Sequence, residues 1–125
     1  MSGDISIQIE IFGITKLEGY IDRIFAPITA DAILDKIPFV MRGRWSFGSK
    51  KYWTLPGLGL SKGTNPKSKK QIEKGELVYN PKTDEIIIAI QDVEFPNKVN
   101  KVGKVKIKDE ILNARNGLNT KVLKA

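Results

Sequence analysis

The stretch ISIQIEI at residues 5–11 alternates isoleucine with a polar side chain at every step. A period of two residues is typical of a β-strand with one face in the core and the other toward water. A second stretch, Ile86–Ile90, has the sequence IIIAI and is apolar on both faces. Since such a run is buried best in a strand that is covered on both sides, we expect it at the centre of a sheet. Both stretches indicate a mainly β protein.

Shorter runs with the same period occur along the rest of the chain, with turn residues between them about every ten positions. The sequence predicts about eight strands, at Ile5–Ile11, Tyr20–Phe25, Phe39–Phe47, Lys50–Leu55, Glu76–Tyr79, Glu85–Ile90, Val99–Lys108 and Leu118–Leu123. One amphipathic helix, Ala30–Ile37 with Thr29 as its N-cap, should cover an open end of the sheet, and Asp109 should begin a short second turn. This order favours a closed eight-stranded antiparallel barrel with one or two capping helices, and a β-sandwich is the alternative.

The composition excludes many kinds of catalysis. The chain has 125 residues, enough for one domain over residues 1–125, and it contains no cysteine and no histidine. Disulfides, thiolate or histidine metal sites and Ser-His-Asp triads are therefore excluded. The paired acidic residues lie at predicted turns, where capping and solvation explain them, so we expect neither a metal nor a cofactor. These absences argue against most classes of enzyme.

Positive charge is concentrated in one segment. The net charge is +7, and residues 50–74 carry seven lysines against one acidic residue, Glu73. Residues 57–74 are also rich in glycine, so we expect a flexible basic loop with at most a helical turn near residues 68–73. We expect this loop to be dispensable for folding. Nucleic-acid binding is one hypothesis for this loop, through the five lysines Lys62, Lys67, Lys69, Lys70 and Lys74. Because the loop contains no arginine and no aromatic residue, a merely solvated surface is the favoured interpretation.

The chain shows no signal for a membrane. No apolar run approaches the length of about 18 residues that a transmembrane helix needs, and the N-terminus lacks the pattern of a signal peptide. We therefore expect a soluble cytoplasmic protein with no membrane partner. The abundance of isoleucine and lysine is also typical of thermophilic proteins.

Three stretches resemble motifs of the small prokaryotic cyclophilin-like proteins. Arg44-Trp45 followed by Tyr52-Trp53 and Pro56 is similar to that family's Arg-Trp-Gly, Tyr-Phe and Pro pattern. The segment 75–81 resembles its Gly-Asp-x-x-Tyr-Trp-Pro, and residues 100–105 resemble its Asn-x-x-Gly-Lys-Val. The order and spacing agree over residues 5–123. The resemblance implies a cyclophilin-like barrel and a candidate cleft, but no reaction, because the small family has no settled activity.

The chain also departs from the family's pattern. Asn80 stands where the family has its second tryptophan, and residues 89–94 replace a Phe-Phe-Gly-x-Thr-Pro stretch. The Phe-His-Arg and Gln-Gly-Gly-Asp motifs of true peptidyl-prolyl isomerases are absent. These departures make a binding role more plausible than catalysis.

The predicted ligand site consists of two arginines and three aromatic residues: Arg42, Arg44, Tyr52, Tyr79 and Phe95. The leading hypothesis is a non-catalytic module that binds a peptide or small ligand in a cleft bordered by these side chains. The enzymatic alternative is weak peptidyl-prolyl isomerisation, in which Arg44 would weaken the conjugation of the prolyl amide and lower its barrier of about 20 kcal/mol. The simpler interpretation is that both arginines lie on the solvent face of an alternating strand. The same alternation predicts that Trp45 and Phe47 belong to the core.

Overall fold

A computed structural model describes residues 4–45 and 50–125 of the chain. Its elements, in chain order, are β1 (Ile5–Ile11), β2 (Thr15–Ile21), α1 (Pro27–Lys36), β3 (Phe39–Arg42), β4 (Arg44–Trp45), β5 (Tyr52–Leu55), β6 (Lys69–Ile72), β7 (Glu76–Asn80), β8 (Glu85–Ala89), β9 (Val93–Val105), the 3-10 helix η1 (Asp109–Asn113) and β10 (Asn119–Lys124). The prediction of a mainly β protein with one short α-helix is confirmed. Within the described part of the chain there are ten strands rather than the eight predicted.

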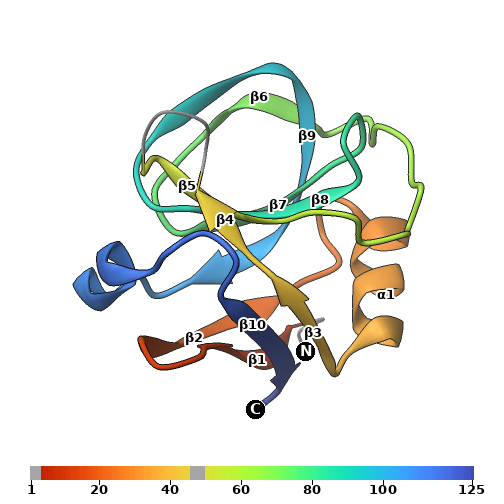
Figure 1. Ribbon diagram of the computed structural model, residues 1–125. Helices are drawn as coiled ribbons and strands as arrows, with labels where there is room; N and C mark the ends of the chain where they lie inside the picture. The colour runs from red at the N-terminus through yellow and green to blue at the C-terminus, as the bar shows by residue number, and fades with distance from the viewer. Residues whose placement is uncertain (1–3, 46–49) are drawn as a thin grey trace.

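All strand pairs are antiparallel, in the order β3-β10-β1-β2-β9-β7-β8-β5-β4, and β6 pairs separately with β9. The first and last strands of this order, β3 and β4, are consecutive in the chain and have only Gly43 between them. In Figure 1 they run from the lower strands, β1, β2 and β10, to the upper strands around β5. The predicted strand Phe39–Phe47 is thus divided at Gly43, and Phe47 lies outside the described residues.

The sheet separates two apolar clusters. The inner cluster is the main core and includes the isoleucines of β1 together with Trp45, Trp53 and Tyr79. The outer cluster consists of Ile72, Val78, Ile87, Ala89, Phe95 and Val99, with Tyr52 and Val93 packed at its margin. Figure 1 shows β6 and the first half of β9 arching over β5, β7 and β8, on the side where this outer cluster forms.

Strand β8 explains why Ile86–Ile90 is apolar on both faces. It lies between β7 and β5, and all of its residues are buried. Ile86 and Ile88 contact the inner cluster, whereas Ile87 and Ala89 contact the outer one. The prediction of a central strand is confirmed.

Helix α1 begins three residues earlier than the sequence predicted. Its N-cap is Ala26, and Pro27 occupies the first turn. The N–H groups of the first turn have no acceptor within the helix, so the lack of an N–H in proline costs no helical hydrogen bond. Thr29 is therefore not the N-cap; its buried hydroxyl accepts a hydrogen bond from Asn100 Nδ2 at 3.2 Å. Ala30, Ile33 and Leu34 pack into the inner cluster, as the amphipathic pattern predicted.

The basic segment 57–74 is more ordered than the sequence predicted. Its residues 69–72 form β6, which pairs with β9, where at most a helical turn was expected. Leu58 is 1% exposed and belongs to the inner cluster. The interpretation of the segment as an exposed loop is therefore wrong at both of these places, since apolar side chains at each end are buried.

No helix among the described residues is long and apolar enough to cross a membrane.

Candidate functional site

The structure places the predicted site residues on both faces of the sheet. Tyr52 and Phe95 meet in the outer cluster, with ring centroids 5.0 Å apart in an edge-to-face arrangement. Tyr79 is fully buried in the inner cluster, on the opposite face. The structure therefore does not bring Tyr79 into one cleft with Tyr52 and Phe95.

Arg44 lies beside Tyr52 and is held by a carboxylate. Its guanidinium forms an ion pair with Glu85 at 3.2 Å, and the side chains are 59% and 11% exposed. Burial and the negative charge of Glu85 raise the pKa of Tyr52, and the positive charge of Arg44 opposes them. Arg44, Glu85 and Tyr52 thus form one electrostatic group on the outer face.

Arg42 has different surroundings from Arg44. It is exposed on β3 and lies opposite Asn119 of β10, whereas Arg44 lies opposite Thr54 of β5. The two arginines lie on consecutive strands, on either side of Gly43, and they border different neighbouring strands.

Thr54 has an unusual hydroxyl. The residue is 3% exposed and lies in register with Arg44 on one side and Ile87 on the other. Its Oγ1 atom is buried and has no hydrogen-bond partner among the described residues. Most buried polar atoms in proteins are partnered, so this atom is an exception, and Ser68 Oγ is another among the described residues.

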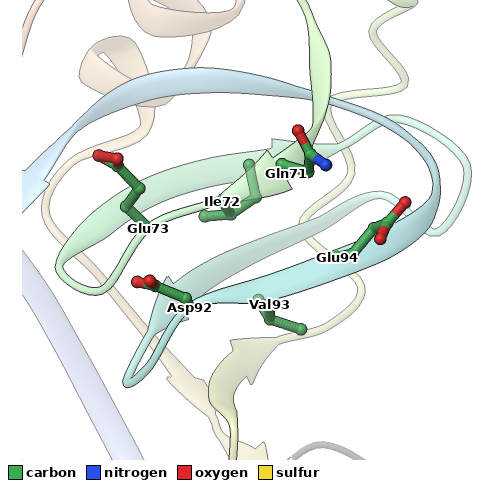
Figure 2. Close-up of a pocket in the computed structure, with 6 residues that line it drawn as sticks. All are labelled: Gln71, Ile72, Glu73, Asp92, Val93 and Glu94. Carbon is green, nitrogen blue, oxygen red and sulfur yellow. The ribbon is translucent and has the colours of Figure 1, made fainter.

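A pocket of about 300 Å³ opens next to the outer cluster, between paired residues of β6 and β9. Figure 2 shows Ile72 and Val93 in the middle of it, with Glu73 and Asp92 at one end and Gln71 and Glu94 at the other. The Asp92 carboxylate accepts the Lys74 N–H at 2.8 Å. No group of three or more acidic side chains in the described chain is arranged to hold a metal ion.

Glu76 is a buried charge that the sequence did not reveal. It is 2% exposed and forms ion pairs with Lys101 at 3.0 Å and with Lys69 at 3.4 Å. Burial raises the pKa of its carboxyl, but the Glu73 N–H and the two lysines outweigh this effect and the net pKa is lowered. Lys69 therefore has a structural partner, so it is not available as an isolated phosphate contact.

The five lysines of the nucleic-acid hypothesis differ in their surroundings. Lys67, Lys70 and Lys74 are exposed, Lys69 pairs with Glu76, and Lys62 lines a separate pocket with Lys82 and Lys98. Sequence reasoning missed the last two, because they are far from Lys62 along the chain.

Tyr79 and Asp84 anchor the start of the basic segment. The Tyr79 hydroxyl donates to Asp84 Oδ1, and it accepts the Lys62 N–H at 3.2 Å. The Asp84 carboxylate also accepts the N–H groups of Gly59, Leu60 and Ser61. Burial and the bond to Asp84 raise the pKa of Tyr79 to about 12. Burial also raises the pKa of Asp84, but the Tyr79 hydroxyl and the three backbone N–H groups outweigh this effect and the net pKa of Asp84 is lowered. The Tyr79 hydroxyl is thus fully hydrogen-bonded within the protein, and its role is structural.

Comparison with known proteins gives a fold and no family. No family model matches the sequence, and no curated protein matches it. The hypothetical protein AF2241 from Archaeoglobus fulgidus has a similar structure, with a TM-score of 0.78 and 17% identity over 100% of this chain and 98% of that one. McbB, solved in complex with tryptophan, is similar with a TM-score of 0.75 and 12% identity. The match covers 94% of this chain but only 44% of McbB. At these identities the likeness establishes the fold alone.

Proposed function

We propose that the chain is a non-catalytic binding domain that holds a small ligand or short peptide on its outer face, at Arg44, Tyr52 and Phe95. The observation that carries the proposal is the exposed guanidinium of Arg44 near the half-buried ring of Tyr52, which packs edge-to-face on Phe95. Tyr52 is half-buried and provides aromatic contact area, with the buried ring of Phe95 packed against it, and a guanidinium recognises a carboxylate or carbonyl oxygen. The ligand class is therefore a molecule with an apolar or aromatic group and an adjacent carbonyl or carboxylate.

Tryptophan is a suitable first probe, because it has an aromatic ring and a carboxylate and because the structurally similar McbB was solved with it. The chain should be titrated with tryptophan and with a capped proline-containing peptide, with binding followed by calorimetry and amide chemical shifts. We expect Arg44→Gln to weaken the tighter-binding probe at least about tenfold, which corresponds to one lost charge-assisted contact. Arg42→Gln removes the same charge from β3, which borders β10 rather than β5, and should change the affinity less than about threefold.

Two outcomes would contradict this assignment. Shift changes confined to residues away from Arg44, Tyr52 and Phe95 would place the ligand elsewhere. Equal losses in Arg44→Gln and Arg42→Gln would indicate a general charge effect rather than a site.

Peptidyl-prolyl isomerisation is not the function that this geometry supports. The Phe-His-Arg and Gln-Gly-Gly-Asp motifs of true isomerases are absent, so the residues that would anchor a prolyl substrate are missing. The ion pair with Glu85 uses one N–H of the Arg44 guanidinium and leaves others for a ligand. We expect no acceleration of the cis-to-trans relaxation of a proline-containing peptide at micromolar protein concentration. Acceleration that disappears in Arg44→Ala would overturn this expectation and assign catalysis to the same site.

We also propose that the sheet is a closed cyclophilin-like barrel in which β3 and β4 act as one bent strand. Two hydrogen bonds at the bend support this: the Gly43 N–H donates to Leu118 O at 2.9 Å, and the Gly43 carbonyl accepts the Gly117 N–H at 2.7 Å. Hydrogen bonds to the β10 side of the sheet therefore extend from β3 through Gly43. At the next residue, Arg44, strand β4 begins to pair with β5. A cytoplasmic location remains part of the proposal.

A further inference from the structure

A second pocket, of about 290 Å³, lies where three separate segments meet. The segment after β5, the turn between β7 and β8, and the middle of β9 each contribute one lysine to it, namely Lys62, Lys82 and Lys98. Thr64 and Asn97 also line this basic pocket. It is a different place from the outer face that carries the proposed function.

The turn and β9 are fixed to one another by Asn80. Its Oδ1 atom accepts the Lys82 N–H at 3.0 Å and the Asn97 side-chain amide at 2.9 Å. Asn80 is 8% exposed, so these bonds are largely protected from water. Asn80 therefore fixes the backbone from which the Lys82 and Lys98 side chains extend.

The third segment is fixed by two buried neighbours in the sheet, Tyr79 of β7 and Asn100 of β9, which are paired in register. Asn100 donates to the Gly63 carbonyl at 2.9 Å and accepts the Asn65 N–H at 2.9 Å, while Tyr79 accepts the Lys62 N–H. The walls of the pocket are thus held in place without a ligand.

The three ammonium groups have no ion-pair partner among the carboxylates that the structure describes. Other cations near buried acids are paired, as Lys69 and Lys101 are with Glu76. The acid closest in sequence, Asp84, is occupied by Tyr79 and by three backbone N–H groups. Three like charges around one concavity repel each other and attract an anion.

We propose that the basic pocket binds the phosphate group of a small phosphorylated molecule. Lysine ammonium groups act as point charges and are common phosphate ligands, and three of them match a group that carries close to two negative charges. The Thr64 hydroxyl adds a polar group at the rim, whereas the Asn97 amide already donates to Asn80 Oδ1 and to the Lys98 carbonyl and serves to hold the wall.

A small molecule fits this pocket better than a nucleic-acid strand does. The pocket contains no aromatic side chain on which a base could stack. The exposed lysines Lys67, Lys70 and Lys74 are not among its lining residues.

The test is a titration of the full chain with inorganic pyrophosphate at low salt, by calorimetry and amide chemical shifts. The variant Lys62→Gln/Lys82→Gln/Lys98→Gln should bind at least about tenfold more weakly than the unaltered chain. The matched variant Lys67→Gln/Lys70→Gln/Lys74→Gln removes the same charge outside the pocket and should lose less than about threefold. Without any anion, the pocket variant should also have a higher Tm at low salt than the matched variant, because it alone relieves the repulsion within the pocket.

The proposal is overturned if pyrophosphate does not bind, or if both variants lose affinity equally. It is also overturned if a single-stranded oligonucleotide binds more tightly than pyrophosphate and if both variants lower the affinity for it equally. That result would indicate a diffuse nucleic-acid-binding surface. Shift changes at residues 62–64 and 97–98 that the pocket variant abolishes would support it. Because Arg44→Gln leaves this pocket intact, loss of tryptophan binding and loss of pyrophosphate binding can be measured separately.

Discussion

Replacing Gly43 with alanine should destabilise the protein by about 3 kcal/mol or more. A Cβ atom at this position would lie 2.2 Å from Cε2 and Nε1 of Trp53. The indole cannot withdraw easily, since Trp53 is fully buried, packs edge-to-face on Trp45 at 5.1 Å and donates to Thr120 Oγ1 at 3.1 Å. Gly43 also carries the two backbone bonds at the bend between β3 and β4, so a shift of the backbone would break them.

The measurement is chemical denaturation of Gly43→Ala beside Gly63→Ala. A Cβ atom at Gly63 would meet nothing within 4 Å, so this control should change the free energy of unfolding by less than about 1 kcal/mol. A Gly43→Ala variant as stable as the control would show that Trp53 repacks and that the bend tolerates a side chain.

The sequence predicted strands well where one period was clear. The alternation in ISIQIEI identified β1 because every second residue of it faces the inner cluster. The run Ile86–Ile90 identified a central strand, since only burial on both faces explains a fully apolar strand. Strand β6 was missed because its residues 69–71 are exposed and polar; its place comes from pairing with β9, which is distant in sequence.

The candidate site was predictable only in part. The alternation correctly placed Arg44 on the outside and Trp45 in the core. It could not show that Tyr52 and Tyr79 lie on opposite faces, because β5 and β7 are buried on both sides and each face can accept an aromatic ring. The basic pocket was equally hidden, since its lysines come from three segments that only the fold brings together.

Asp84 accepts the backbone N–H groups of residues 59–61, and this anchoring leads to the second large expected effect. Asp84→Asn should destabilise the protein by about 2 to 3 kcal/mol, because one amide oxygen cannot replace a carboxylate that accepts the Tyr79 hydroxyl and three backbone N–H groups. Asparagine is the appropriate replacement, since the φ of Asp84 is 56° and asparagine tolerates this left-handed conformation. Asp92→Asn is the matched control, because Asp92 is exposed and accepts the Lys74 N–H; it should cost less than about 1 kcal/mol.

The pH dependence of stability provides a second readout of the same anchor. The pKa of Asp84 is lowered in the fold, so its contribution is present above the ordinary value of 3.8 and is lost as the pH falls through the lowered pKa. The pKa of Tyr79 is raised to about 12, so its contribution is present below the ordinary value of 10.0 and is lost as the pH rises toward 12. The free energy of unfolding should therefore decline at both extremes.

Asp84→Asn should change both limits of that profile. The acid decline should become shallower, although Glu76, whose pKa is also lowered, will keep part of it. The highest tyrosine pKa, followed by ultraviolet absorbance, should fall toward the ordinary value because Tyr79 loses a charged acceptor. If the tyrosine titration and the acid decline are the same in Asp84→Asn as in the unaltered chain, the Tyr79–Asp84 bond does not hold the basic segment.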